Sequence, residues 1–275
     1  MSVVAVVLSW NGREDTLACL ASLAGEPLTP LVVDNGSTDG SVEALRERGV
    51  EVVENGRNLG FAAGMNVGIR VALERDAEHV LTLNNDVEVE PGFLGPLLEA
   101  GDVACPQILF GDGRTVWYAG ARWDPRAGYH GRNMGYGGPP VGGGPYETDR
   151  ACGGALVASR RAWEDVGLFD ESLFAYAEDT DWSLRARALG YRVVVVPASV
   201  VRHKVSASSG GEGSPTSIYF TLRNSLRVAE RHAPLGPLGT ARRRAVAVTA
   251  HALQALLSRR KLAGLRAVAR AVGDL

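Results

Sequence analysis

The sequence predicts an α/β protein with a mostly parallel central sheet, flanking helices and additional helices at its C-terminal end. Two observations indicate this class. Short β-branched runs alternate with helical patterns through residues 1–100, and polar residues gather where those runs end. Alternation of strand and helix implies right-handed crossovers, which bring the carboxyl ends of the strands to one edge of the sheet. Ligands of such sheets bind at that edge.

The elements of the first half follow in chain order. Strands are expected at residues 3–8, 31–34, 50–54, 79–83 and 103–108. Apolar residues at helical spacing predict helices at 13–24, 41–48, 63–75 and, after Pro91, as far as residue 100. The stretch 111–145, rich in Gly, Tyr and Trp, predicts hairpins and loops inserted into the fold.

Regular structure returns after this insertion. An ordered segment is expected at 151–159, a helix near Arg161, another at about 178–189, and a buried strand at 192–196 that Pro197 ends. The serine- and glycine-rich segment 206–215 predicts a flexible loop, which either closes over a ligand or has no such role. The remaining helices are expected at 216–232, at 238–257 and near the C-terminal end.

Composition argues against a nucleic-acid partner. The 275 residues include 29 Lys and Arg against 31 Asp and Glu, so the molecule as a whole does not attract polyanions. After Pro237, however, Asp274 is the sole acidic residue of the sequence. The basic residues of this segment are Arg242, Arg243, Arg244, Arg259, Arg260, Lys261, Arg266 and Arg270. This basic tail either contacts an anionic membrane surface or is simply solvated.

Other features predict a cytoplasmic protein, at most peripheral at the inner face of the cell membrane. Cys19, Cys105 and Cys152 are far apart and lack the spacing of a zinc or redox site, so we expect them to be reduced. The N-terminal sequence does not resemble a secretory signal, and no apolar run approaches the length needed to span a bilayer.

Two common phosphate-binding signatures are missing. Residues 9–12 stand where a dinucleotide-binding unit would carry GxGxxG, and the sequence has no GxxxxGK[ST] loop. The only lysines are Lys204 and Lys261. Kinase-like and dinucleotide-binding functions are therefore disfavoured.

The second predicted strand ends at Asp34, before a turn with Asn35 and then a helix. A carboxylate in this place can accept the imide N–H of a uracil or thymine ring, as a pyrimidine-nucleotide site requires. The alternative is that Asp34 only forms an Asx turn and helix cap. From the residues alone, both interpretations stay open.

The next two strand ends are also polar. The third is followed by Asn58, Gly60 and Asn66, which offer close backbone approach and amide hydrogen bonds. The fourth ends in Asn84-Asn85-Asp86. A carboxylate here is a suitable ligand for the Mg²⁺ or Mn²⁺ that offsets the charge of a leaving diphosphate.

In their order and spacing these segments resemble glycosyltransferase family 2, an inverting family with the GT-A fold, and its rhamnosyltransferase-like branch in particular. The resemblance covers about residues 3–225. The matching segments are 9–11, 33–41, 58–61, 84–86 and Glu178-Asp179. It implies a donor-binding half at 1–110, an acceptor-binding and base-bearing half at 111–215, and a helical extension with a basic tail at 216–275.

By this resemblance, the nucleotide-sugar donor is held by one group of residues: Ser9, Asn11, Asp34, Asn35, Asn58, Gly60, Asn66, Asn84, Asn85 and Arg223. Asp86 takes the place of the metal-binding aspartate of the DxD motif, and His203 that of a histidine completing the metal or diphosphate site. Asn84 departs from the family pattern because it occupies the motif's first acidic position. A strict dependence on Mn²⁺ or Mg²⁺ is therefore in question.

The same resemblance places the general base at Asp179. A base is needed because the acceptor hydroxyl loses its proton as it attacks the anomeric carbon. Acids at a helix start can also serve the macrodipole alone. The expected acceptor-side residues are Gly153, Gly154, Glu178 and Trp182.

The expected function is inverting transfer of a sugar from a dTDP- or UDP-sugar to a sugar or lipid-linked acceptor, in cell-surface polysaccharide or glycolipid synthesis. Two alternatives are a sugar-1-phosphate nucleotidyltransferase and a catalytically silent binding subunit of a polysaccharide assembly complex. The first needs a basic Gly-rich loop after the first strand, which residues 9–12 do not supply. Retention of Asp34, Asp86 and Asp179 argues against the second.

Overall fold

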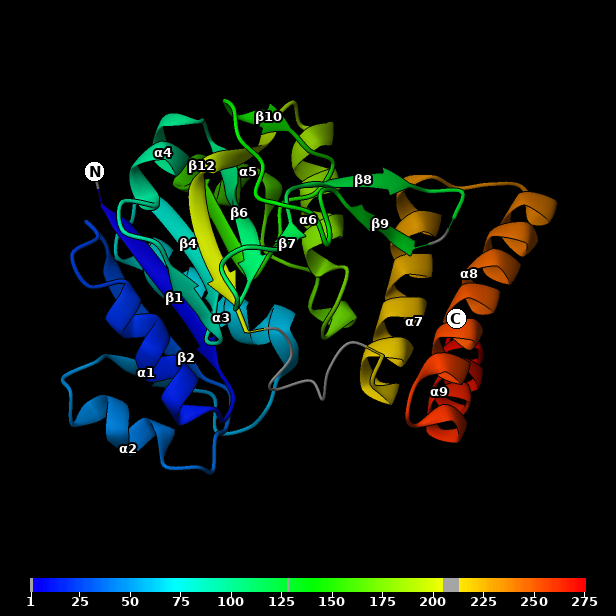
Figure 1. Cartoon of the computed structure of the whole chain (residues 1–275), viewed down its shortest axis with the longest axis horizontal. Coiled ribbons are helices and arrows are strands. Elements are labelled where there is room, and N and C mark those ends of the chain that lie inside the picture. Colours follow the sequence, from blue (N-terminus) through cyan, green and yellow to red (C-terminus); the bar gives the residue numbers. More distant parts are fainter. Residues whose placement is uncertain (1, 128, 205–212) are drawn as a thin grey trace.

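The computed structural model describes residues 2–127, 129–204 and 213–275 (Figure 1). Its strands are β1 Val3–Ser9, β2 Thr29–Asp34, β3 Val52–Glu54, β4 His79–Asn84, β5 Val87–Val89, β6 Val103–Phe110, β7 Val116–Tyr118, β8 Ala121–Asp124, β9 Tyr129–Asn133, β10 Tyr146–Glu147, β11 Ala155–Ser159 and β12 Val193–His203. Its helices are α1 Arg13–Ser22, α2 Ser41–Arg46, α3 Gly60–Glu74, α4 Leu94–Glu99, α5 Arg160–Val166, α6 Glu178–Ala188, α7 Pro215–His232, α8 Pro237–Leu257 and α9 Lys261–Gly273, with a 3₁₀ turn, η1, at Glu171–Leu173.

One sheet joins the two halves of the molecule. In the described ranges it has ten strands, with the main order β10-β12-β6-β11-β4-β1-β2-β3, while β5 pairs with β12 and β7 with β6. The predicted parallel arrangement holds for β1 to β4, where β1 lies between β2 and β4 and β3 continues from β2. The full sheet is mixed because β11 runs antiparallel to both β4 and β6. The insertion forms the separate β8–β9 hairpin.

Strand β12 corrects one expectation. Pro197 was predicted to end this strand, but the strand continues to His203 with a register shift between Val196 and Val200. A proline cannot donate a ladder hydrogen bond, so within a sheet it is tolerated at such an irregularity. Beyond it, β12 pairs with β5 and carries His203 to the edge where β4 ends.

Close packing against the sheet fixes the position of helix α3. Helix α3 lies against β1 and β2 through glycines: a Cβ built on Gly68 would lie 2.2 Å from a Val6 methyl, and one on Gly64 2.8 Å from Leu8. Larger residues would force α3 off the sheet. The start of α3 is therefore held directly beside the carboxyl ends of β1 and β2.

The C-terminal helices have a small core of their own. Side chains of α7, α8 and α9 pack together around Leu222, Leu226 and Ala247, apart from the core of the sheet. These three helices lie side by side at the end of the molecule opposite α1 and α2 (Figure 1). No helix in the described part of the chain is both long and apolar enough to cross a bilayer.

Candidate active site

Loops after β1, β2 and β4 meet at one edge of the sheet. Ser9 pairs with Asp34 across β1 and β2, and Leu8 pairs with Asn84 across β1 and β4. The Asn85 amide donates to the carbonyl of Asn11 at 3.1 Å, which joins the first and last of these loops. The clustering predicted from the strand ends is therefore present.

Asp34 is the buried carboxylate of this edge, with 2% of its surface exposed. Its Oδ2 accepts the backbone N–H groups of Gly36 and Ser37, both at 3.0 Å, as in an Asx turn. Its Oδ1 is buried and has no hydrogen-bond partner among the described residues. A buried acceptor without a donor is costly, so this oxygen is suited to receive an N–H group from a ligand.

The nearby asparagines form a network that shapes the loops. Asn35 donates to the carbonyl of Gly60 at 3.0 Å and accepts from the backbone N–H of Leu59 and the amide of Asn55. Asn58 accepts from both the Asn35 amide and the backbone N–H of Gly60. Asn35 and Asn58 thus hold the chain before α3 in place through these hydrogen bonds. Asn55, which was not among the predicted site residues, belongs to the same network.

Ser9 and Asn11 also serve the loops. The Ser9 hydroxyl is fully buried and lies 3.0 Å from the Thr16 hydroxyl of α1, so Ser9 presents only backbone to the site. The Asn11 side chain accepts the Thr38 N–H at 3.0 Å, and its own N–H donates to the Ser37 hydroxyl. Asn11 therefore clamps the turn that carries Asp34.

Asp86, just after β4, and His203, at the end of β12, form a buried pair. His203 Nε2 lies 3.0 Å from Asp86 Oδ1, and the side chains are 9% and 6% exposed. Trp117 packs edge-on against the imidazole, with ring centroids 4.8 Å apart. Lys204 donates its N–H to the carbonyl of Asp86, and its ammonium group bridges Asp15 and Glu88. Trp117 and the bridging role of Lys204 were not predicted.

The pair offers one oxygen and one nitrogen ligand to a divalent cation. Within the described residues there is no cluster of three or more His, Cys, Asp or Glu side chains able to hold a metal. Asp86 and His203 alone leave most of a coordination sphere open, so they fit a cation that is also bound by ligand oxygens. They do not form a closed structural metal site.

Gly153 and Gly154 bring Asp179 close to the end of β4. A Cβ on Gly154 would lie 3.0 Å from the side chain of Asn84, and one on Gly153 3.1 Å from the Cβ of Asp179. The Gly153 N–H donates to Asp179 Oδ2 at 3.2 Å. A carboxylate at the start of α6 therefore stands next to the site where the polar strand ends converge.

Its neighbour Glu178 is buried, with Oε2 lacking a partner among the described residues. Burial and the adjacent Asp179 raise the pKa of Glu178 to about 8. Glu178 is then protonated at neutral pH and cannot accept a proton. Of the two acids, Asp179, whose Oδ2 accepts the Gly153 N–H, is the candidate base.

Comparison with models of known protein families identifies the family of this chain. The model of Glycosyl transferase family 2 matches residues 4–155, which is more than half of the chain, and that of Glycosyl transferase family group 2 matches residues 150–261. The chain belongs to glycosyltransferase family 2.

Similar proteins place this glycosyltransferase near rhamnosyltransferases. It is 30% identical over 266 residues to N-acetylglucosaminyl-diphospho-decaprenol L-rhamnosyltransferase of Mycobacterium tuberculosis, covering 84% of the chain and 85% of the relative. It is 26% identical over 249 residues to dTDP-rhamnosyl transferase RfbF of Shigella flexneri, covering 85% and 82%. Among solved structures, S. aureus TarS in complex with UDP-GlcNAc shares the GT-A fold, with a TM-score of 0.65 at 18% identity over 100% of this chain and 80% of that one.

Helix α7 holds the loop that leads to the glycosyltransferase's Glu178-Asp179 pair. The buried Asn224 amide donates to the carbonyls of Leu173, Ala175 and Tyr176 at 2.5 to 2.9 Å. Ala177, directly before α6, has a positive φ of 69°, which is unfavourable for a residue with a side chain. Asn224 supports this strained loop and thereby positions α6.

Asp181 secures the same region from the other side. It is fully buried and bonded to Arg185 at 2.9 Å, and to Arg231 and His232 of α7 at 2.8 Å each. Despite the opposing effect of burial, these partners lower its pKa to about 2. Helices α6 and α7 are thus tied together by charge as well as by packing.

Three predicted site residues of the glycosyltransferase lie elsewhere. Trp182 is fully buried between Trp163 and Phe169 and donates to the Gly167 carbonyl, so it cannot stack on an acceptor. Asn66 is also fully buried, and its amide bonds to Phe169 and Glu171.

Arg223, the third of these residues, lies on α7. Its guanidinium bonds to Asn224, to the Tyr219 hydroxyl and to the Ser172 carbonyl. These partners belong to α7 and η1, not to the strand ends, so the structure does not support the predicted donor contact of Arg223. The sequence resemblance placed Trp182, Asn66 and Arg223 near the site, but their contacts give them supporting roles.

A pH-dependent stability follows from Glu178. The folded state keeps its proton up to a pH of about 8, whereas the unfolded state releases it near 4.5, so stability falls as pH rises between these values. We expect Glu178→Gln to remove this loss. In denaturant unfolding at several pH values, the stability of the variant relative to the unmodified protein should increase across this window.

Glu171→Gln is the matched control for this measurement. Bonds from Asn66 and Arg70 lower the pKa of Glu171, so its stabilising contribution is fully present above 4.5. The effect of Glu171→Gln should therefore be constant across the window. A flat difference for Glu178→Gln as well would contradict a protonated Glu178.

Proposed function

We propose that this glycosyltransferase moves a sugar from a dTDP- or UDP-sugar to an acceptor hydroxyl, with inversion, in the synthesis of a cell-surface polysaccharide or glycolipid. The observation that carries the proposal is the close approach of Asp179 to the end of β4 across Gly153 and Gly154. This approach supports a role for Asp179 as a base beside the place where the donor diphosphate would lie. The Shigella relative, a dTDP-rhamnosyl transferase, supports a dTDP-sugar, and the mycobacterial relative, an N-acetylglucosaminyl-diphospho-decaprenol L-rhamnosyltransferase, supports a lipid-linked acceptor.

In this reaction Asp179 takes the proton of the acceptor hydroxyl. The hydroxyl oxygen forms a bond to the anomeric carbon as the bond from that carbon to the diphosphate oxygen breaks, and the nucleoside diphosphate leaves. A single displacement inverts the anomeric configuration and needs no covalent enzyme intermediate. Asp86 and His203 would hold a divalent cation, which would supply positive charge to the leaving diphosphate.

The buried Oδ1 of Asp34, which has no partner in the described part of the chain, supports a uracil or thymine base in the donor. Both bases carry an imide N–H that this buried oxygen can accept, whereas the equivalent ring nitrogen of cytosine is an acceptor and would face the carboxylate without a proton. The donor nucleotide is therefore expected to be dTDP or UDP rather than CDP.

A thermal-shift titration with UDP, dTDP, CDP, GDP and ADP, with and without Mn²⁺, tests the proposal. UDP and dTDP should raise the melting temperature most. Asp34→Asn should weaken UDP binding by about tenfold to a hundredfold, the effect of losing about 1–3 kcal/mol for a buried hydrogen bond, and should improve CDP binding relative to UDP. Asp124→Asn, which alters an exposed carboxylate of β8, is the control. Unchanged UDP binding by Asp34→Asn would refute this base recognition.

A further inference from the structure

Helix α8 presents an apolar face that no described part of the chain covers. Its inward side packs on α7 and α9 through Ala247, His251 and Ala255, spaced four residues apart. On its other side, residues spaced by three and four are exposed: Leu238, Ala245, Val246, Thr249, Ala250, Leu253, Leu256 and Leu257. We call this set the α8 face. Leu238 and Leu257 are 86% and 88% exposed, which is unusual for leucine.

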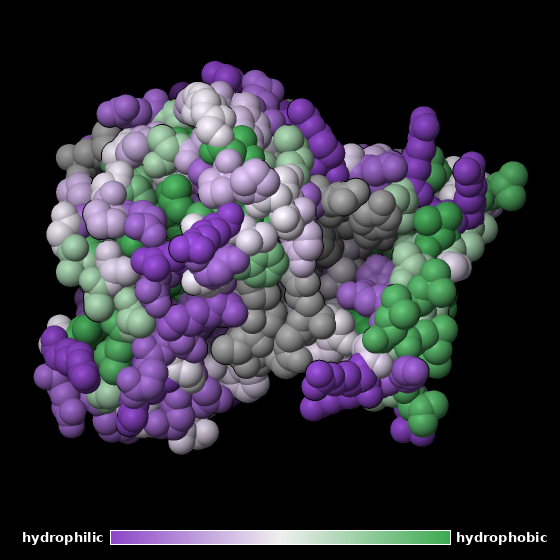
Figure 2. Space-filling model, viewed as in Figure 1, coloured by the Kyte–Doolittle hydropathy of each residue, from purple (hydrophilic) through white to green (hydrophobic). Residues whose placement is uncertain are grey.

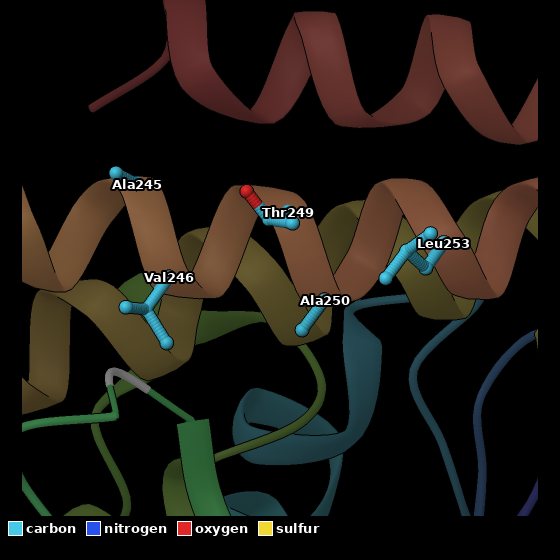
Figure 3. A pocket seen from close by; sticks show the side chains of 5 residues that line it. All are labelled: Ala245, Val246, Thr249, Ala250 and Leu253. Carbon is cyan, nitrogen blue, oxygen red and sulfur yellow. The ribbon is translucent and has the colours of Figure 1, made fainter.

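The α8 face is continuous along the helix. Five of its side chains follow one another on α8 and line a shallow depression (Figure 3). The space-filling view shows apolar surface gathered over the same helix (Figure 2). Between Ala245 and Leu257 the face carries no charged residue. Contiguous apolar surface of this kind marks a site of interaction.

Basic side chains flank the α8 face and lack counter-charges. Arg242 lies between Leu238 and Ala245, while Arg259, Arg260, Lys261 and Arg266 follow Leu257, and all five are exposed. None of them forms an ion pair with any residue that the structure describes. The sequence from residue 233 to residue 273 contains no Asp or Glu. The chain that carries and follows the face is therefore basic, although Arg244 of α8 pairs with Glu230 of α7.

This combination identifies the occupant. We propose that the α8 face docks on an anionic membrane surface, with its leucines entering the acyl boundary and the flanking basic residues contacting lipid headgroups. An amphipathic helix with one apolar side and basic flanks lies in this way in the plane of a bilayer. A second copy of the chain fits less well because a symmetric contact would bring the same arginines together with no carboxylate on the face to offset them.

Vesicle co-sedimentation of the full-length protein tests the proposal. The protein should bind vesicles of phosphatidylcholine mixed with phosphatidylglycerol and bind pure phosphatidylcholine much more weakly. Arg259→Gln and Arg260→Gln should each lower partitioning about fivefold, the factor for about 1 kcal/mol per basic residue at the surface. Leu253→Ser and Leu257→Ser should each lower it about tenfold, since each removes apolar area from the acyl boundary.

Matched controls lie on other surfaces. Leu189→Ser changes a leucine that is 58% exposed just after α6, and Arg161→Gln changes an exposed arginine of α5. Both should bind vesicles like the unmodified protein, and all variants should keep its melting temperature because the altered side chains are exposed. Equal binding by the α8 variants and the controls would overturn the proposal.

A different result would assign the α8 face to another copy of the chain. If the unmodified protein is a dimer in analytical ultracentrifugation without lipid, and Leu253→Ser with Leu257→Ser makes it a monomer, the membrane proposal fails. Vesicle binding requires neither donor nor acceptor. Its outcome is therefore separate from the test of sugar transfer.

Discussion

Replacing Asp179 with asparagine is expected to lower the transfer rate by about 10²–10⁴-fold, the contribution of a general base. Asparagine has the same shape and can still accept the Gly153 N–H, so the start of α6 should be retained. Because Asp179 bonds to Gly153 and Thr180 and not to the turn that carries Asp34, nucleotide binding should persist. The measurement is the transfer rate from dTDP- and UDP-sugars beside thermal shifts with the matching nucleotides.

Two variants make this result specific. Asp165→Asn alters a surface carboxylate of α5 that bonds to Tyr191, and it should transfer at the unmodified rate. Glu178→Gln should cost much less than Asp179→Asn, because a protonated glutamate and a glutamine both lack a basic oxygen anion. Full activity of Asp179→Asn would show that another group takes the acceptor proton.

The second large effect is expected at Asp86. Asp86→Ala removes half of the Asp86–His203 pair and should lower transfer by about 10²–10³-fold, as when one group that stabilises transition-state charge is lost. It should also abolish any increase that Mn²⁺ causes in the thermal shift with UDP. The measurement is the transfer rate as a function of Mn²⁺ concentration, after removal of metal with a chelator.

Neighbouring changes distinguish a metal site from a structural pair. Glu88→Gln removes a carboxylate that bonds to Lys204 but not to His203, and it should have a small effect. Asn84→Asp supplies the acid that the sequence lacks at this position and should tighten metal binding, because a carboxylate is a stronger ligand than an amide for a hard cation. If chelation leaves the unmodified rate intact and Asp86→Ala remains active, the pair has no metal role.

Much of the fold could be predicted because local patterns specify it. The apolar runs at β1, β2 and β4 and the turn residues after them located the edge of the sheet where Asp34 and Asp86 lie. The antiparallel placement of β11 between β4 and β6 could not be read in the same way. Strand order depends on pairing between distant segments, and a run of apolar residues has the same appearance in either direction.

From the sequence, the acidic residues of the candidate site could be located more readily than its other polar residues. Asp34 and Asp86 were selected because they lie where strands end, and Asp179 because it follows another acid at the start of a helix. Asparagine has both a donor and an acceptor and readily satisfies backbone groups, which is what Asn35, Asn58 and Asn66 do. The route of β12 past Pro197 to His203 depends on pairing with β5 and β6, which local sequence does not reveal. The possible closing loop at 206–215 lies mostly outside the described residues.

Helix α7 has a consequence for the geometry of acceptors. Through Asn224 it holds the loop before Asp179, and on its other side it packs with α8 in one small core. Asp179, the proposed general base, and the outer surface of α8 are therefore joined through α7, which acts as a spacer between them. If α8 rests on a bilayer, the spacer sets the height at which an acceptor hydroxyl is reached. Selection among lipid-anchored acceptors would then depend on the length between anchor and hydroxyl as well as on the sugar itself.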